Sequence, residues 1–114
     1  MEGCIFCMIV AGDIPCAKVY EDEAVLAFED LNPQMPVHTL VVPKKHYSNI
    51  ADDIPDIEMG QLFNAAAKVA QIKGIAESGF RIIVNTGPDA QQTVHHIHVH
   101  VLGGSRMNIK SPKA

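Results

Sequence analysis

Residues 92–104 read Gln-Thr-Val-His-His-Ile-His-Val-His-Val-Leu-Gly-Gly, and this stretch predicts a strand with two different faces. His96, His98 and His100 stand at every second position and alternate with β-branched residues, which favour an extended backbone. Because side chains of a strand alternate between its faces, we expect the three imidazoles on one face at a spacing of about 6–7 Å. Neutral imidazole acts as nucleophile, proton donor or metal ligand near pH 7. The pattern therefore indicates a functional face and favours it over a solvated polar face or an expression tag.

The rest of the chain predicts an α+β domain. The 3, 4-residue spacing of apolar side chains from Met59 to Ala70 indicates one long helix with a single buried face. This helix is expected to begin near Pro55, which is tolerated in a first turn, and to end at Gly79, which can cap it. Strands on both sides of a long helix are typical of α+β folds rather than of a doubly wound sheet. The other expected elements are a short helix over 4–11 and strands over 17–21, 24–30, 38–43, 80–85 and 94–102.

Length and charge limit the class of protein. The chain has 114 residues, of which 47% are hydrophobic and 19% charged, so we expect one globular domain over residues 1–114. A monomer of this size buries roughly two-thirds of its unfolded surface, and an open sheet edge would gain from pairing with a second copy, so a homodimer is expected. The net charge is −4 and Lys44-Lys45 is the one basic doublet, so no surface for duplex nucleic acid is expected.

The first residues and the cysteines bear on the compartment. The apolar run over 4–11 follows Glu2 and is stopped by Gly12-Asp13. A signal peptide would carry positive charge before such a run, and a membrane span would need about 20 apolar residues. Three cysteines are an odd number, which argues against a framework of disulfides. We therefore expect a cytoplasmic protein with no membrane partner.

Cys4 and Cys7 are spaced C-x-x-C, which suits a metal site, a redox centre or two buried thiols. A thioredoxin-type redox pair would need a strand before it, and no strand is expected before Cys4. A structural zinc site would need two more ligands, and spacing alone does not choose them among the six histidines.

The alternating histidines, followed by two apolar residues, resemble the signature of the histidine triad family of nucleotide hydrolases and transferases. The similarity extends over about residues 4–107 and is greatest to the Hint branch, the nucleoside phosphoramidases. It implies a five-stranded antiparallel sheet that pairs across a homodimer into a ten-stranded sheet. The other motifs that carry the resemblance are Cys4-Ile5-Phe6-Cys7, Ile14-Pro15, Val19–Asp22, Ala27–Asp30, Asn32-Pro33-Gln34, His38–His46, Asn85 with Gly87, and Leu102–Gly104.

The resemblance implies a covalent mechanism. His98, held in one tautomer by the backbone of His96, would attack the α-phosphate of a nucleoside 5′-phosphoramidate or a related ester or anhydride. The nucleotidyl-histidine would then be hydrolysed. His100 would bind the phosphoryl oxygens, Thr93 would assist at the phosphate and leaving group, and Asn85 would reach the ester oxygen. His38 is expected to support the site without reacting.

The resemblance also implies a purine nucleotide as ligand and a structural zinc ion. Asp30 would accept hydrogen bonds from the ribose hydroxyls. Zinc would be held by Cys4, Cys7, His46 and His96. The implied nucleotide-binding residues are Phe6, Ile14, Phe28, Asp30, Leu31, Asn85, Gln92, Thr93, Val94, His98 and His100.

Three departures from the family pattern bear on the site. Gln91 stands where the branch usually has glycine, so the residue is strained if the position needs φ > 0. His95 is an additional histidine, expected to pack or to face solvent. The chain also has no tryptophan, which some relatives carry in their tail, so a leaving-group preference is not carried over.

Three alternative functions stay open at this point. The first is a dinucleoside polyphosphate hydrolase, and the second is a regulatory nucleotide-binding module that has lost its chemistry. The third takes His96, His98 and His100 as a catalytic metal triad. Cys4 and Cys7 disfavour the third, because they offer a metal a better set of ligands. Turnover of adenosine 5′-phosphoramidate beside a diadenosine polyphosphate would separate the first two from the phosphoramidase.

Overall fold

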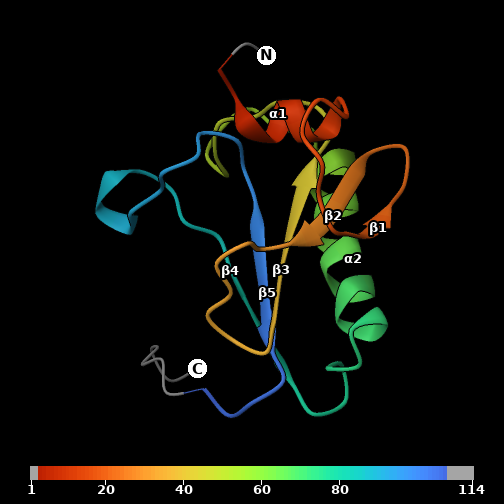
Figure 1. Cartoon of the computed structure of the whole chain (residues 1–114). Helices are drawn as coiled ribbons and strands as arrows, with labels where there is room; N and C mark the ends of the chain where they lie inside the picture. The colour runs from red at the N-terminus through yellow and green to blue at the C-terminus, as the bar shows by residue number, and fades with distance from the viewer. Residues whose placement is uncertain (1–2, 108–114) are drawn as a thin grey trace.

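The computed structural model describes residues 3–107, which form a five-stranded antiparallel sheet and two α-helices (Figure 1). The α+β class is thereby confirmed, while the ends of the expected domain, residues 1–2 and 108–114, lie outside the described residues. Within the described part, no helix is long and apolar enough to cross a membrane. The strand order is β1-β2-β3-β5-β4. The elements are α1 (Ile5–Val10), β1 (Lys18–Glu21), β2 (Val25–Glu29), β3 (Val37–Pro43), α2 (Asp56–Ile72), β4 (Phe80–Ile83), a 3₁₀ helix (Pro88–Ala90) and β5 (Val99–Gly103).

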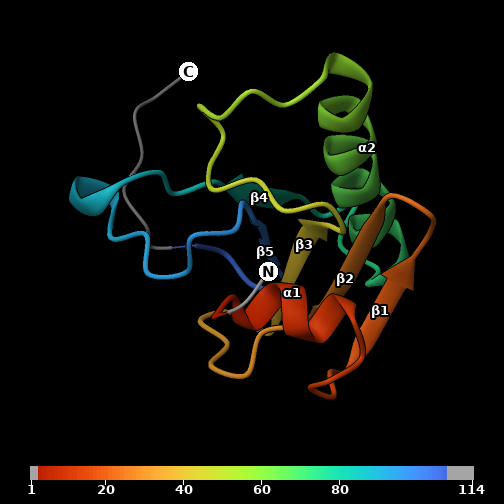
Figure 2. The ribbon, with the colours of Figure 1, turned by 90° about the horizontal axis from the view of Figure 1, so that it is seen from above.

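The two helices cover opposite faces of the sheet, as the view from above shows (Figure 2). Neighbouring residues of β2 point to opposite faces, so Val25 and Ala27 pack in the same cluster as α2, while Leu26 and Phe28 pack with Phe6 of α1. The α2 face contains the larger core. Its helical members are Leu62, Ala65, Ala66, Val69 and Ala70, close to the expected periodic face.

The face toward α1 is the one that carries the histidines. His100 of β5 is paired with Leu40 of β3, which belongs to the cluster around Phe6. Val99 and Val101 point the other way and are fully buried under α2. The expected division of this strand into a histidine face and an apolar face is therefore present.

The expected strand over 94–102 is too long at its first end, because regular pairing begins only at Val99. The register places Val99 opposite Val41, so two positions further out it would set Ile97 opposite Pro43. Proline has no N–H to donate, and the carbonyl oxygen of Pro43 accepts from the ring of His96 instead. The N–H of Ile97 donates to Tyr47 O at 2.7 Å. Residues 96 and 97 are thus held by the last residue of β3 and by the loop after it, not by strand pairing.

The expected end of the long helix at Gly79 is also wrong, since α2 ends at Ile72. Gly74 follows the cap with φ 73° and supplies the left-handed residue that ends the helix. Ile75 N donates to Ala70 O at 3.0 Å, and Gly74 N donates to Gln71 O at 3.1 Å. These two bonds form a Schellman motif, and the buried side chain of Ile75 anchors it.

Candidate functional site

A cavity of about 320 Å³ lies between α1 and the histidine face of the sheet. This volume falls in the range of about 300–1,000 Å³ that is typical of small-molecule sites. Apolar side chains form most of its wall, which also contains the polar side chains of Glu29, Asp30, Thr93, His98 and His100. Most of the expected nucleotide-binding residues line it, namely Phe6, Ile14, Phe28, Asp30, Leu31, Thr93, Val94, His98 and His100.

His98 is held in a single tautomer. Its Nδ1 lies 2.8 Å from the carbonyl oxygen of His96, and because a carbonyl only accepts, Nδ1 carries the proton. The ring is packed edge-on between Phe6 and His100, with centroid separations of 5.0 Å to each. Burial lowers the pKa of His98. His98 is therefore a neutral imidazole with an unprotonated Nε2, which is what a nucleophile requires.

A chain of hydrogen bonds gives His100 the opposite tautomer. The backbone N–H of Gln34 donates to Nδ1 of His38 at 3.0 Å, so a neutral His38 carries its proton on Nε2. That nitrogen lies 2.9 Å from Nδ1 of His100 and donates to it. Burial, together with the neighbouring histidines, lowers the pKa of His100 to about 4, so its one proton lies on Nε2. His98 therefore offers a lone pair and His100 an N–H donor.

Asp30 joins this network from the rim of the cavity. Its Oδ1 accepts from the backbone N–H of Asn32 at 2.9 Å, and its Oδ2 lies 3.2 Å from Nε2 of His38. The carboxylate of Asp30 and the rings of His38 and His100 are close enough to suggest a metal site. The tautomer argues against one, because the nitrogen of His38 that faces the group carries a proton and cannot be a ligand.

Three expected nucleotide-binding residues have unexpected surroundings. Leu31 is 98% exposed at the cavity rim. Asn85 is half-buried beyond β4 and does not line this cavity. The buried amide of Gln92 accepts from Gly87 N and donates to the carbonyl oxygens of Ser48 and Val94, at 2.8–3.0 Å. Gln92 thus fastens the segment before the histidines, and the ligand roles of Asn85 and Gln92 stay predictions.

Gln91 has φ 61° and ψ 37°, the left-handed conformation that its place at a family glycine suggested. Within residues 3–107 it is the one non-glycine residue with positive φ. A Cβ in this region costs about 1–2 kcal/mol. The strain lies in the turn that leads into Thr93 and Val94, whose side chains line the cavity.

Cys4, Cys7, His46 and His96 form a compact group of four ligand atoms, all within 4.8 Å of one another. Nδ1 of His96 lies 3.4 Å from each sulfur atom, and Nδ1 of His46 lies 3.2 Å from Sγ of Cys7. Tetrahedral zinc with ordinary Zn–S and Zn–N bonds separates such atoms by about 3.5 Å. Nε2 of His96 donates to Pro43 O at 2.8 Å, which leaves Nδ1 as a lone pair toward the sulfurs. The donor set therefore fits a structural zinc ion.

Comparison with known proteins gives consistent matches along the chain. A family model described as the HIT domain matches residues 11–107. A histidine triad protein of Clostridium difficile is 48% identical, with a TM-score of 0.90 over 97% of this chain and 98% of that one. A HIT family hydrolase of Clostridium thermocellum is 44% identical, with a TM-score of 0.90 over 96% and 97% of the two chains. A 14 kDa zinc-binding protein of Zea mays is 42% identical over 113 residues, which cover 91% of this chain and 84% of that protein.

Relief of the strain at Gln91 provides a direct test of the turn. Gln91→Gly is expected to raise the free energy of unfolding by about 1 kcal/mol, because glycine adopts positive φ without a Cβ penalty. Gln91→Ala keeps the Cβ and is the matched control, for which no stabilisation is expected. Urea denaturation of the three proteins measures the difference. A glycine variant no more stable than the alanine variant would contradict a left-handed residue 91.

Proposed function

The chain belongs to the HIT domain family, and from this premise we propose that it is a nucleotide hydrolase of the Hint type. It would cleave nucleoside 5′-phosphoramidates, or related nucleotidyl esters and anhydrides, at the α-phosphate. The observation that supports this most is the pair of opposite tautomers in the wall of the cavity, which suit His98 as nucleophile and His100 as donor. A module that only binds nucleotides would have no need of an imidazole lone pair placed in this way.

The reaction divides into two displacements at phosphorus. In the first, the lone pair on Nε2 of His98 forms a P–N bond while the bond from phosphorus to the leaving nitrogen breaks, and that nitrogen takes up a proton as the amine departs. In the second, water attacks the same phosphorus, the bond to Nε2 breaks, a proton is released and the nucleoside monophosphate leaves. His100 would donate its Nε2 proton as a hydrogen bond to a phosphoryl oxygen in both steps. Thr93, whose side chain lines the same cavity, would assist at the phosphate.

The apolar part of the cavity would hold a purine base. Phe6 and Phe28 meet edge to face, with centroids 5.6 Å apart, and Ile14 lines the cavity with them. Leu31 exposes almost its whole side chain at the rim, where a bound base would cover it. Asp30 would accept the hydroxyls of the ribose, which its acceptor-only oxygens suit.

Zinc would stabilise the structure of the site and would take no part in the reaction at phosphorus. It would join two residues of the first helix, Cys4 at the N-cap of α1 and Cys7 within α1, to His46 and His96. The same short helix carries Phe6, whose ring contacts that of His98. The ion would thus keep Phe6, part of the cavity wall, in contact with His98, and its role would be structural.

The edge of the sheet and the state of the cysteines suit a homodimer in the cytoplasm. β4 is an edge strand, and its Phe80 and Ile82 are 40% and 41% exposed. Pairing of β4 with that of a second copy would give a ten-stranded sheet and cover these side chains. The three cysteines are free thiols, in keeping with the reducing conditions of a cytoplasm.

Replacement of His98 tests the nucleophile. His98→Asn keeps a polar group but forms no bond to phosphorus, so turnover of adenosine 5′-phosphoramidate should fall by several orders of magnitude, which corresponds to roughly 4–8 kcal/mol of barrier. Affinity for AMP should change much less. Alkaline denaturation of the wild type during turnover, followed by mass spectrometry, should locate a nucleotidyl group on His98. Near-normal activity of the variant, or loss of activity on chelation with the fold intact, would point instead to a metal-centred reaction.

Replacement of Asp30 tests the ribose contact. Asp30→Asn should weaken binding of AMP far more than binding of 2′-deoxy-AMP, because a hydrogen bond to a charged group contributes about 1.5–3 kcal/mol. Calorimetric titration of both ligands against both proteins measures this, with the deoxynucleotide as internal control. Equal losses for the two ligands would remove Asp30 from the ribose site.

Zinc content should depend on two of the three cysteines. The double change Cys4→Ser and Cys7→Ser is expected to abolish zinc and lower the Tm, since two thiolates supply the charge that binds the ion. Cys16→Ser, a cysteine outside the cluster, is the matched control and should keep its zinc. Elemental analysis and thermal denaturation give the two readouts. Purified wild type without zinc would refute the assignment.

A further inference from the structure

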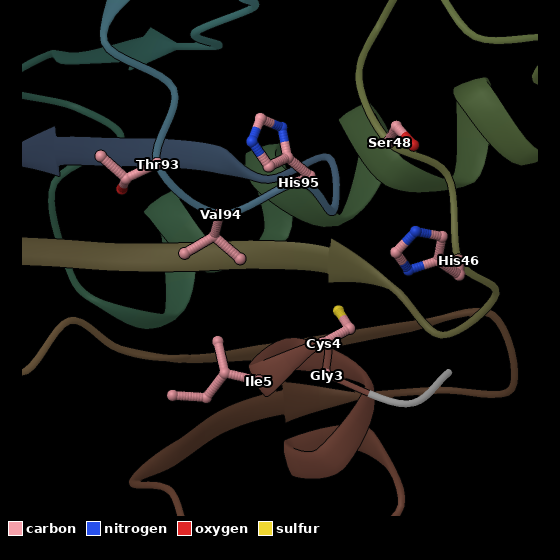
Figure 3. Close-up of a pocket in the computed structure, with 8 residues that line it drawn as sticks. All are labelled: Gly3, Cys4, Ile5, His46, Ser48, Thr93, Val94 and His95. Carbon is pink, nitrogen blue, oxygen red and sulfur yellow. The ribbon is translucent and has the colours of Figure 1, made fainter.

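A second cavity lies beside the nucleotide cavity and contains side chains that the proposed chemistry does not use (Figure 3). Its volume is about 400 Å³. In Figure 3, His95 lies between Thr93 on one side and Ser48 and His46 on the other. The lining residues are Gly3, Cys4, Ile5, His46, Ser48, Thr93, Val94 and His95.

The two cavities share a wall. Ile5, Thr93 and Val94 line both of them. The nucleotide cavity, which His98 and His100 line, is therefore bounded in part by the same Thr93 that bounds the second cavity. A substituent on the phosphate that extends past Thr93 would enter the second cavity rather than the apolar slot of the base.

The second cavity has the polarity of a site for an anion. Ser48 and Thr93 each carry a hydroxyl, His95 carries an imidazole, and none of the eight lining residues is Asp or Glu. A nearby carboxylate, that of Asp52, accepts from the backbone N–H groups of Ser48 and Asp53 and does not line the cavity. O–H and N–H donors without a competing carboxylate favour an acceptor-rich or anionic group.

His95 is the extra histidine of the sequence, and its side chain is solvent-exposed rather than packed. Cys4 and His46, on the other side of the cavity, belong to the zinc-binding group. Among residues 3–107, the donors of this cavity that have no partner of their own are thus those of Ser48, Thr93 and His95. They lie on two loops, 47–49 and 92–95, that the amide of Gln92 ties together through its bond to Ser48 O.

We propose that this second cavity binds the leaving group of the nucleotide substrate and selects leaving groups that carry an anionic group, either a carboxylate or a phosphate. The proposal rests on the phosphoramidase function proposed above. Ser48 and His95 would be the specificity-determining residues, because they contact only the leaving group. The nucleoside and the reacting phosphate would be bound without them.

A series of adenosine 5′-phosphoramidates that differ only in the leaving amine tests this proposal. One substrate has no extension, being the simple –NH₂ compound, and four have similar extensions that end in a carboxylate, a phosphonate, a neutral amide or an ammonium group. For the wild type, kcat/KM should be roughly tenfold higher for the anionic ends than for the neutral one, and lower still for the cationic one. The carboxylate and phosphonate arms distinguish the two sources of negative charge.

Three variants connect that preference to the second cavity. His95→Ala and Ser48→Ala should each reduce the preference for the anionic ends, and His95→Glu should reverse it in favour of the ammonium end. Ser48→Thr keeps the hydroxyl and should retain the preference. Gln61→Ala, an exposed change on α2, is the control for unspecific effects. All of these proteins should turn over the –NH₂ compound within about twofold of the wild type, because it does not reach the second cavity.

The outcomes separate this inference from the function on which it rests. Turnover of the –NH₂ compound together with equal kcat/KM for anionic, neutral and cationic ends would overturn the leaving-group site and leave the phosphoramidase standing. A preference that survives both His95→Glu and Ser48→Ala would place the selecting groups elsewhere and also overturn it. Failure to turn over any of the five compounds would remove the function, and the leaving-group site with it.

Discussion

The hydrogen bond from Nε2 of His96 to the carbonyl oxygen of Pro43, 2.8 Å long, connects the fold, the group of Cys4, Cys7, His46 and His96, and the ring of His98. It occupies the last carbonyl of β3, where proline already lacks a donor, and so ends the pairing of β3 with β5. It fixes the tautomer of His96 and leaves Nδ1 for the sulfurs of Cys4 and Cys7. It also holds residue 96 in the place from which its own carbonyl accepts the proton of His98.

The site uses backbone groups to define the state of each imidazole. A carbonyl oxygen selects the tautomer of His98, and a backbone N–H, from Gln34, selects that of His38 and through it that of His100. Burial keeps His96 and His100 neutral, with their pKa values lowered to about 4. Because a backbone carbonyl does not titrate, the group that selects the Nδ1–H tautomer of His98 stays an acceptor at any pH.

Much of the site can be predicted from local sequence patterns. The rest depends on strand register and on contacts between distant segments. Alternation of histidine with β-branched residues predicts the shared face. The glycine position occupied by Gln91 marks a site where positive φ would cause strain, and the structure shows that φ is indeed positive there. The late start of β5 was not predictable, because it depends on which residue of β3 lies opposite Ile97. Likewise, the choice of Gly74 over Gly79 as helix cap depends on the burial of Ile75, which periodicity alone does not reveal. The second cavity brings together loops about 45 residues apart in the chain, and no single motif marks it.

Helix α1 has only six residues, far fewer than a helix needs to be stable alone in water. It nevertheless supplies Ile5, Phe6 and Ile9 to the wall of the cavity that His98 and His100 line. The order of this helix and the occupancy of the cavity are therefore thermodynamically linked, and whatever binds there also contributes to holding the helix in place. Local opening of α1, at a free energy below that of global unfolding, would dismantle the binding surface while the five-stranded sheet persists.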